Sequence, residues 1–196
     1  MSRDEAICTR AAQLIEQAHD GDHADQCDSL MQQAYHLLRP LVERDVPEAQ
    51  YLHAYSTINL EVSDEGDRKK RRIELVKKAA EAGHARAQFT FGQMYESDAD
   101  LPADPVRAAY WFEKSALQGY PYAQWVHGLN LLNGNGVRHD EALVLDFIRR
   151  AAEGRFEGAI QFVADAYSSG THGFTRDLVE AELWRQRLLE PDVMPY

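Results

Sequence analysis

Ser115-Ala116-Leu117-Gln118-Gly119, followed four residues later by Ala123-Gln124, sets the architecture of this chain. The pattern is a small-residue segment that ends in glycine, and then a new segment that opens on alanine. It occurs three times, and its opening residues Ala87, Ala123 and Ala159 stand 36 residues apart. A fixed period of this length is typical of stacked helical hairpins, in which each unit buries its apolar face mainly against its neighbours. The repeat therefore predicts an all-α fold.

About five helical hairpins are expected along the chain. The first has helices at about 3–18 and 24–44, and Pro40 should kink the second helix because proline removes a backbone hydrogen bond. The other four hairpins are expected at 47–60 with 67–82, 85–97 with 105–118, 121–133 with 140–153, and 157–169 with 177–189. Glycines close three of the second helices, where a left-handed backbone is expected. These are Gly83, Gly119 and Gly154.

Small residues recur inside the first helix of each of these hairpins. They stand five residues after the start of the helix, at Ala54, Gly92, Gly128 and Ala164. A small side chain lets one helix approach its neighbour closely, so we expect these positions to lie at the contact between the two helices of a hairpin.

Two stretches of the chain resemble the Sel-1-like repeat, a relative of the tetratricopeptide repeat. The loop Gly134-Asn135-Gly136-Val137-Arg138-His139-Asp140 and the helix Arg107-Ala108-Ala109-Tyr110-Trp111-Phe112-Glu113-Lys114-Ser115-Ala116-Leu117-Gln118-Gly119 are the most similar. The second hairpin departs from the pattern, with Asp45 in place of a closing glycine and residues 60–66 in place of the glycine loop. The resemblance implies a right-handed α-α superhelix, or solenoid, that acts as an adaptor or scaffold without chemistry of its own.

The resemblance also implies a division of the chain. We expect a capping hairpin at residues 1–46, four Sel-1-like repeats at 47–189 and an irregular tail at 190–196.

One face of the first helices is expected to line the concave side of the solenoid, by similarity to tetratricopeptide proteins. Polar and aromatic residues at helical spacing gather on it, and aromatic side chains can anchor a bound protein or peptide. The candidate partner-binding residues are Tyr51, Tyr55, Asn59, Arg86, Phe89, Gln93, Trp125, Leu129 and Asn133. The last repeat has Gln161 and Asp165 at the matching positions. The alternative is that the aromatic residues only pack between repeats.

The net charge of the chain limits the classes of partner that it can bind. With 21 Lys and Arg against 32 Asp and Glu, the net charge is −11, which argues against general nucleic-acid binding and suits a basic protein partner. No apolar signal core or membrane-length run is present, so we expect a cytoplasmic protein, as a monomer or weak homodimer. The alternative to an adaptor is an inhibitor or immunity-type protein that neutralises a basic toxin or enzyme.

Sequence motifs for catalysis or metal binding are absent or weak. No phosphate loop, nucleophile elbow or zinc-protease motif occurs, so we expect neither enzymatic activity nor a cofactor. The run from His19 to Asp28 contains possible metal ligands, but glycine interrupts it, and an acidic loop explains it better than a metal site. Cys8 and Cys27 are expected as reduced thiols, and His53 and His127 as core or groove-edge residues. The basic run 68–72 is either an anion patch or the solvated face of a helix.

Overall fold

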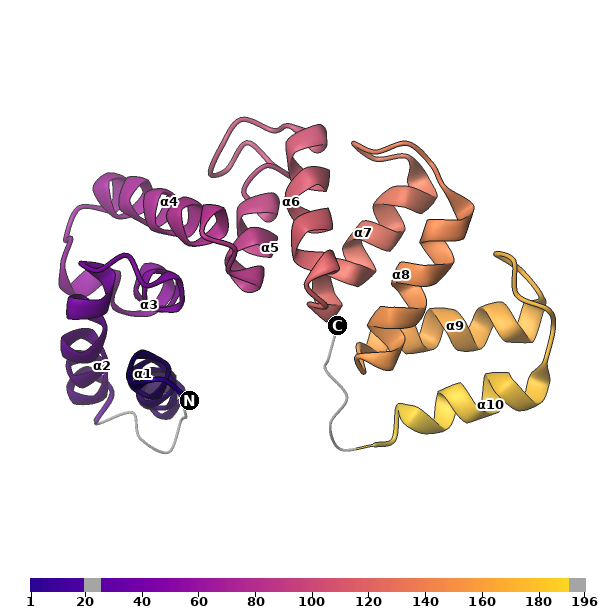
Figure 1. Ribbon diagram of the computed structural model, residues 1–196, viewed down its shortest axis with the longest axis horizontal. Coiled ribbons are helices and arrows are strands. Elements are labelled where there is room, and N and C mark those ends of the chain that lie inside the picture. The colour runs from indigo at the N-terminus through magenta and orange to yellow at the C-terminus, as the bar shows by residue number, and fades with distance from the viewer. Residues whose placement is uncertain (20–25, 191–196) are drawn as a thin grey trace. The chain divides into compact units, whose positions relative to one another are not determined.

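The chain consists of helices arranged as successive hairpins (Figure 1). The computed structural model describes residues 1–19 and 26–190, and within these ranges it contains no strand. The all-α prediction is therefore confirmed. Most of the run from His19 to Asp28, and all but the first residue of the expected tail, lie outside the described residues. No helix in the described part of the chain is long and apolar enough to cross a membrane.

The chain divides into two compact units, residues 1–91 and 92–196, which are described separately below. Unit 1 begins with the hairpin of α1 and α2, which pack on each other. In the second hairpin the short helix α3 packs on the long helix α4. The bounds are α1 Arg3–His19, α2 Cys27–Val42, α3 Pro47–Leu52, the π-helical turn η2 His53–Thr57, the 3-10 turn η3 Ile58–Leu60, and α4 Glu65–Glu81. The predicted domain boundaries at residues 46 and 189 stay a prediction.

Unit 2 holds the most regular repeats. Its helices pack in chain order, α6 on α7, α7 on α8, α8 on α9 and α9 on α10. The bounds are α6 Pro105–Leu117, α7 Pro121–Asn133, α8 Glu141–Glu153, α9 Glu157–Ser169 and α10 Leu178–Arg187. The helix α5, Ala85–Gln93, crosses the boundary between the units and ends four residues earlier than the sequence predicts.

An aspartate caps the start of the second helix in the four hairpins that follow the first, whereas α2 begins after Gln26 without a side-chain cap. In each case the carboxylate accepts a hydrogen bond from a backbone N–H two or three residues further on, at 2.9–3.1 Å. The caps are Asp64, Asp104, Asp140 and Asp177. Such a cap contributes about 1 kcal/mol because it satisfies a donor that the helix itself leaves unpaired. The caps fix where these four second helices begin.

The ends of the second helices follow the prediction with one exception. Gly83 and Gly119 have φ angles of 93° and 88°, as the closing position requires. Asp45, which stands in place of a glycine, also takes a left-handed backbone, with φ of 56°. The expectation for Gly154 is wrong, because its φ is −74° and the left-handed residue is Arg155. Glycine is needed at 154 for another reason: a Cβ there would lie 2.8 Å from Cγ of Pro121.

The two helices of a hairpin touch at the predicted small residues. A Cβ on Gly128 of α7 would lie 2.7 Å from Cγ1 of Ile148 on α8. A Cβ on Gly92 would lie equally close to the ring of Phe112 on α6. Ile148 and Phe112 are fully buried. The prediction of close helix contact at these positions is confirmed, and glycine is what permits it.

Filling this contact should destabilise the protein unless the facing residue shrinks. We expect Gly128→Val to lower the free energy of unfolding by about 1–3 kcal/mol through overpacking, and Ile148→Ala to lower it by about 2–5 kcal/mol through a cavity. Chemical denaturation of the double variant should give a loss smaller than the sum of the two single losses, because the valine occupies the space left by the isoleucine. Additive losses would show that the two side chains do not meet.

The first helix of the second hairpin is not the single α-helix that the sequence predicts over 47–60. It turns into the π-helical turn η2 and the 3-10 turn η3 after Leu52. Buried His53 accounts for the change, since one ring nitrogen hydrogen-bonds within η2 and the other to Glu61, just after η3. Its Nε2–H donates to Glu61 at 2.7 Å, which leaves Nδ1 to accept from the hydroxyl of Thr57 at 2.7 Å. The prediction of a satisfied core histidine is confirmed at His53.

Both cysteines are free, and Cys8 is buried inside the first hairpin whereas Cys27 is half-buried. Burial, with Glu48 and Asp4 nearby, raises the pKa of the Cys8 thiol to about 11. Because the thiolate is the reactive form, iodoacetamide near neutral pH should alkylate Cys27 well before Cys8 in the folded protein. Peptide mapping by mass spectrometry after timed quenching measures both rates, and faster labelling of Cys8 would contradict the buried position.

Candidate partner-binding surface

The aromatic part of the predicted surface lies in unit 1. The rings of Tyr51 and Tyr55 are 5.4 Å apart, and the guanidinium of Arg86 lies 5.3 Å from the centre of the Tyr51 ring. Tyr51 is half-buried, whereas Tyr55 and Arg86 are exposed. The structure thus brings together three of the predicted residues, from α3, η2 and α5, in one aromatic and cationic cluster.

His84 connects α3 to the start of α5 beneath this cluster. Its ring lies 5.1 Å from that of Tyr51. Nδ1 accepts a hydrogen bond from the backbone N–H of Ala87 at 3.1 Å, so Nε2 carries the proton and donates to the carboxylate of Glu48. That hydrogen bond lowers the pKa of Glu48, against the opposing effect of burial. The sequence reasoning missed this pair, although Glu48 and His84 stand one repeat length apart.

A small pocket adjoins Tyr55 on the side of α4. Residues of the first-helix segment form one wall, and residues from the first two turns of α4 form the other. Its volume is about 180 Å³, and it is lined by Ala54, Tyr55, Ile58, Asn59, Glu65, Arg68, Lys69 and Arg72. Two predicted partner-binding residues, Tyr55 and Asn59, therefore meet the basic run, which the sequence analysis treated separately. The spacing of Arg68 and Arg72, four residues apart on one helix face, was the available signal.

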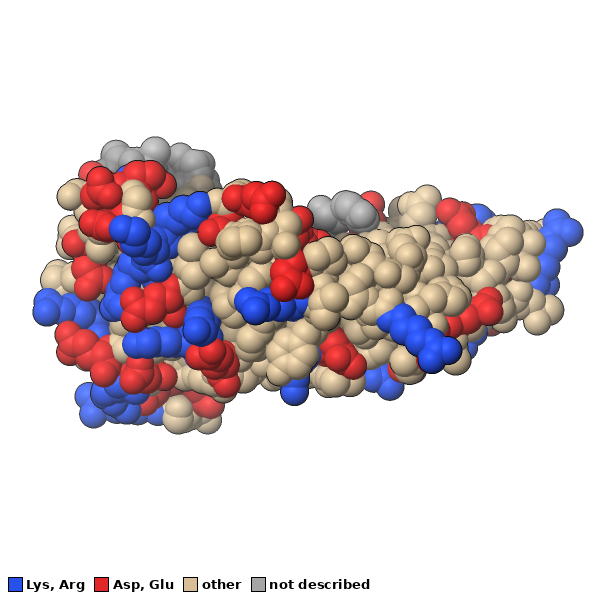
Figure 2. All heavy atoms as spheres, turned by 90° about the horizontal axis from the view of Figure 1, so that it is seen from above, with Lys and Arg blue, Asp and Glu red and all other residues tan. Residues whose placement is uncertain are grey.

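The rest of the basic run is a solvated face held in ion pairs. Lys70 lies 3.2 Å from Asp67 and Arg71 lies 3.1 Å from Glu74, each three residues along α4. Figure 2 shows the result at its left end, where Lys and Arg alternate with Asp and Glu. Surface pairs of this kind contribute little to stability, but they neutralise one another's charge.

Two of the four predicted aromatic residues are core residues. Phe89 and Trp125 are only 9% and 7% exposed. The indole of Trp125 lies 5.9 Å from the rings of Phe156 and Phe162, which follow it in the next hairpin. This burial is what the packing interpretation of the aromatic residues predicts, and it leaves Tyr51 and Tyr55 as the aromatic members with accessible surface.

The remaining predicted positions are mostly polar and accessible. Asn59 is exposed in unit 1, and Gln93 and Asn133 are exposed in unit 2, where Leu129 is half-buried. Their membership of a binding surface stays a prediction.

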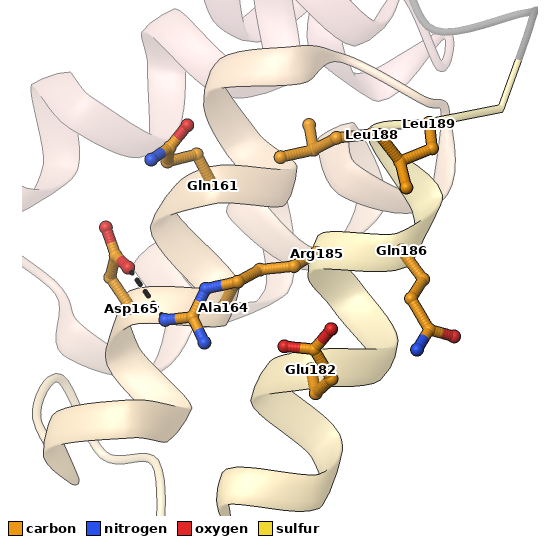
Figure 3. Close-up of a pocket in the computed structure, with 8 residues that line it drawn as sticks. All are labelled: Gln161, Ala164, Asp165, Glu182, Arg185, Gln186, Leu188 and Leu189. Atoms are coloured by element: carbon orange, nitrogen blue, oxygen red, sulfur yellow. Dashed lines mark hydrogen bonds and ion pairs between the residues drawn. The ribbon is translucent and has the colours of Figure 1, made fainter.

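The last hairpin carries a polar pocket at the matching positions. Arg185 reaches from α10 across to α9, where its guanidinium lies 3.4 Å from the carboxylate of Asp165 (Figure 3). The same guanidinium lies 2.7 Å from the hydroxyl of Ser168. The pocket has a volume of about 300 Å³ and is lined by Gln161, Ala164, Asp165, Glu182, Arg185, Gln186, Leu188 and Leu189. Gln161 stands where the preceding repeat has Trp125, so this surface is polar where the inner one is aromatic.

The described residues offer no group of three His, Cys, Asp or Glu side chains placed to hold a metal ion. The run from His19 to Asp28 lies for the most part beyond those residues.

His127 differs from His53 in its surroundings. It is 2% exposed, its ring meets that of Phe147 edge-on at 4.7 Å, and Nδ1 has no hydrogen-bond partner among the described residues. Burial lowers the pKa of His127, and the nearby carboxylate of Glu113 opposes this only in part. A histidine of this kind is neutral in the folded protein at neutral pH.

His127 should make the folded protein sensitive to mild acid. Because its pKa is lower in the folded than in the unfolded chain, the unfolded chain binds the proton first as the pH falls below about 6.5. Stability is therefore complete above that pH and declines as the pH falls toward the lowered folded-state pKa. The variant His127→Phe introduces the residue type that position 91 carries. Urea titrations from about pH 7.5 to about pH 5.5 should show a smaller decline of its free energy of unfolding than in the wild type. An equal decline in both proteins would contradict the assignment.

Comparison with known proteins agrees with this hairpin architecture. The Sel1 repeat family matches residues 73–84, 85–120 and 121–155. Residues 73–155 thus match Sel1 repeats. Two solved structures share its fold. One is a protective antigen present in uropathogenic Escherichia coli strains that displays an SLR fold, with a TM-score of 0.68 and 30% identity. It covers 79% of this chain and 32% of its own length.

The other structure is a Sel1 repeat protein from Oxalobacter formigenes, with a TM-score of 0.67 and 20% identity over 83% of this chain and 64% of that one. A curated relative, an uncharacterized protein of Neisseria meningitidis serogroup B, is 31% identical over 117 residues, which are 60% of this chain and 23% of that protein. The Sel1-repeat chain thus spans less than two thirds of each of these relatives. The resemblance drawn from the sequence and the solenoid fold are confirmed.

Proposed function

We propose that this Sel1-repeat chain is a non-catalytic adaptor that binds a partner protein through the first-helix face of unit 1, centred on Tyr55. Sel1 repeats generally serve as protein–protein interaction scaffolds, which supports the general class. The observation that carries the specific surface is the cluster of Tyr51, Tyr55 and Arg86. An exposed aromatic ring beside a guanidinium is the composition typical of interaction hot spots.

The aromatic cluster is also prepared for binding. The ring of Tyr51 contacts the ring of His84 at 5.1 Å and the guanidinium of Arg86 at 5.3 Å. Side chains that are already ordered lose less conformational entropy when a partner docks, so more of the contact energy contributes to affinity. Tyr55, 46% exposed, extends this ordered surface toward solvent.

The chain offers a matched control for Tyr55. Tyr110 on the second helix α6 is 49% exposed and also lies beside a cation, with Lys114 Nζ 5.5 Å from its ring. Tyr55→Ala and Tyr110→Ala therefore remove the same side chain from equally accessible sites on different helix faces. Both variants should keep the wild-type circular dichroism spectrum and denaturation midpoint within experimental error.

The immobilised wild-type protein is first used to isolate a partner from extracts of the native cells, and the purified partner is then titrated calorimetrically. We expect Tyr55→Ala to weaken binding at least about tenfold, or about 1.4 kcal/mol, and Tyr110→Ala to leave the Kd nearly unchanged. Equal Kd values for the folded wild type, Tyr55→Ala and Tyr110→Ala would falsify the proposal that the partner binds at this surface.

The inhibitor or immunity-type alternative rests on the net charge of −11 alone and stays a prediction. It differs from the adaptor in its salt dependence, because association steered by net charge slows steeply as ionic strength rises.

A further inference from the structure

We propose that the pocket between Tyr55 and α4 receives the carboxylate of a glutamate or aspartate side chain from the partner. The inference rests on the proposed function, since Tyr55 belongs to both the surface and the pocket. It names the chemistry that the partner must present at this point. Four observations support it: the local charge, an unsatisfied donor, the size of the pocket and its apolar floor.

The charge of the pocket is opposite to that of the whole chain. Three cations, Arg68, Lys69 and Arg72, line it together with one carboxylate, Glu65, although the chain carries a net charge of −11. Arg68 and Lys69 are neighbours at the start of α4 and Arg72 follows one turn later, so the three cations line one space. A group that enters there meets a positive local field and is selected for negative charge.

One donor in the pocket lacks an acceptor. Arg68 donates from Nη2 to the carboxylate of Glu65 at 2.5 Å, and this bond fixes the orientation of the guanidinium. Its Nε is buried and has no hydrogen-bond partner in residues 1–19 and 26–190. Buried donors in folded proteins are nearly always paired, so an oxygen acceptor is expected at this position in the bound state. A carboxylate fits best, because its two oxygens can accept from a guanidinium fork.

The size and shape of the pocket limit what enters. A volume of about 180 Å³ is below the roughly 300–1,000 Å³ typical of sites for cofactors and drug-sized ligands. One amino-acid side chain is of the right scale. Ala54 and Ile58 are buried and form an apolar floor, and the ring of Tyr55 adds an apolar wall. The methylene groups of a glutamate or aspartate side chain can lie there while its carboxylate faces α4.

The same helix supplies a matched control. Arg68→Gln with Arg72→Gln removes two cations that line the pocket. Lys70→Gln with Lys77→Gln removes two cations from the same helix that do not line it and that pair with Asp67 and Glu81 instead. Both double variants change the net charge equally, so any general electrostatic effect appears in both.

The direct test follows the arginine Nε–H resonances of the ¹⁵N-labelled full chain by NMR while hexaglutamate is added at millimolar concentrations. Hexaglutamine, hexalysine and inorganic phosphate serve as comparison probes. We expect hexaglutamate to shift the resonances of Arg68 and Arg72 and the amide of Asn59. The Asn59 shift should be lost in Arg68→Gln/Arg72→Gln, and all three shifts should be kept in Lys70→Gln/Lys77→Gln. Absence of these shifts, equal loss in both double variants, or equal shifts with phosphate would overturn the proposal.

The purified partner separates this inference from the proposed function. If the pocket receives a partner carboxylate, Arg68→Gln/Arg72→Gln weakens partner binding at least about tenfold and Lys70→Gln/Lys77→Gln does not. A partner that is lost with Tyr55→Ala but retained by Arg68→Gln/Arg72→Gln would sustain the surface and refute the acidic contact. If hexaglutamate binds in the pocket but Tyr55→Ala leaves the Kd of the partner unchanged, the pocket is supported as a carboxylate site and the adaptor surface is refuted.

Discussion

Close contact between the two helices of a hairpin, at a position where only a hydrogen atom fits, is the constraint on which the rest of the structure depends. At Gly128 the backbone of α7 lies against the side chain of Ile148, and at Gly92 the chain lies against Phe112 in the same way. Such a contact fixes the rotation of the first helix about its axis. It thereby determines that Trp125 is directed into the next hairpin and that Asn133 is exposed to solvent. Which face of the first helix is exposed to solvent is thus a consequence of packing within the hairpin.

The same repeat position can serve packing or recognition, and the neighbouring hairpin decides which. At the second residue after each opening alanine, Tyr51 is half-buried, Phe89 and Trp125 are buried, and Gln161 is exposed. Phe156 and Phe162 cover Trp125, so its aromatic character serves the core. Residue type alone therefore does not identify a binding anchor in a solenoid. An exposed ring that contacts an ordered aromatic and cationic pair, as Tyr55 does beside Tyr51 and Arg86, is the stronger criterion.

The features that the sequence predicts well are those fixed by local chemistry or by the repeat itself. The helical hairpins, the left-handed Gly83 and Gly119, and the close contacts at Gly92 and Gly128 all belong to this class. The shift of the left-handed residue from Gly154 to Arg155 was not predictable, because it depends on the approach of Pro121 in space.

The irregular first helix of the second hairpin was missed for a related reason. The π-helical turn depends on two side-chain hydrogen bonds of His53, one accepted from Thr57 and one donated to Glu61, eight residues away. Glu61 lies in the segment that replaces the glycine loop of the other repeats. The same segment sets the register of α4 against Tyr55, so the pocket could not be derived from the basic run alone. In the second hairpin, where the sequence differs from the repeat, both the backbone conformation and the candidate site differ from the sequence-based prediction.

The charges of this protein act over two different ranges. A net charge of −11 acts at distances up to the Debye length, about 8–10 Å at physiological salt, and favours the approach of basic molecules. The cations beside Tyr55 act at hydrogen-bond distance, where bulk ions screen least. A partner that is basic overall and presents one acidic side chain satisfies both conditions. Long-range attraction would raise its rate of encounter, and the pocket would select its orientation, because any other orientation leaves the buried Nε–H of Arg68 without an acceptor.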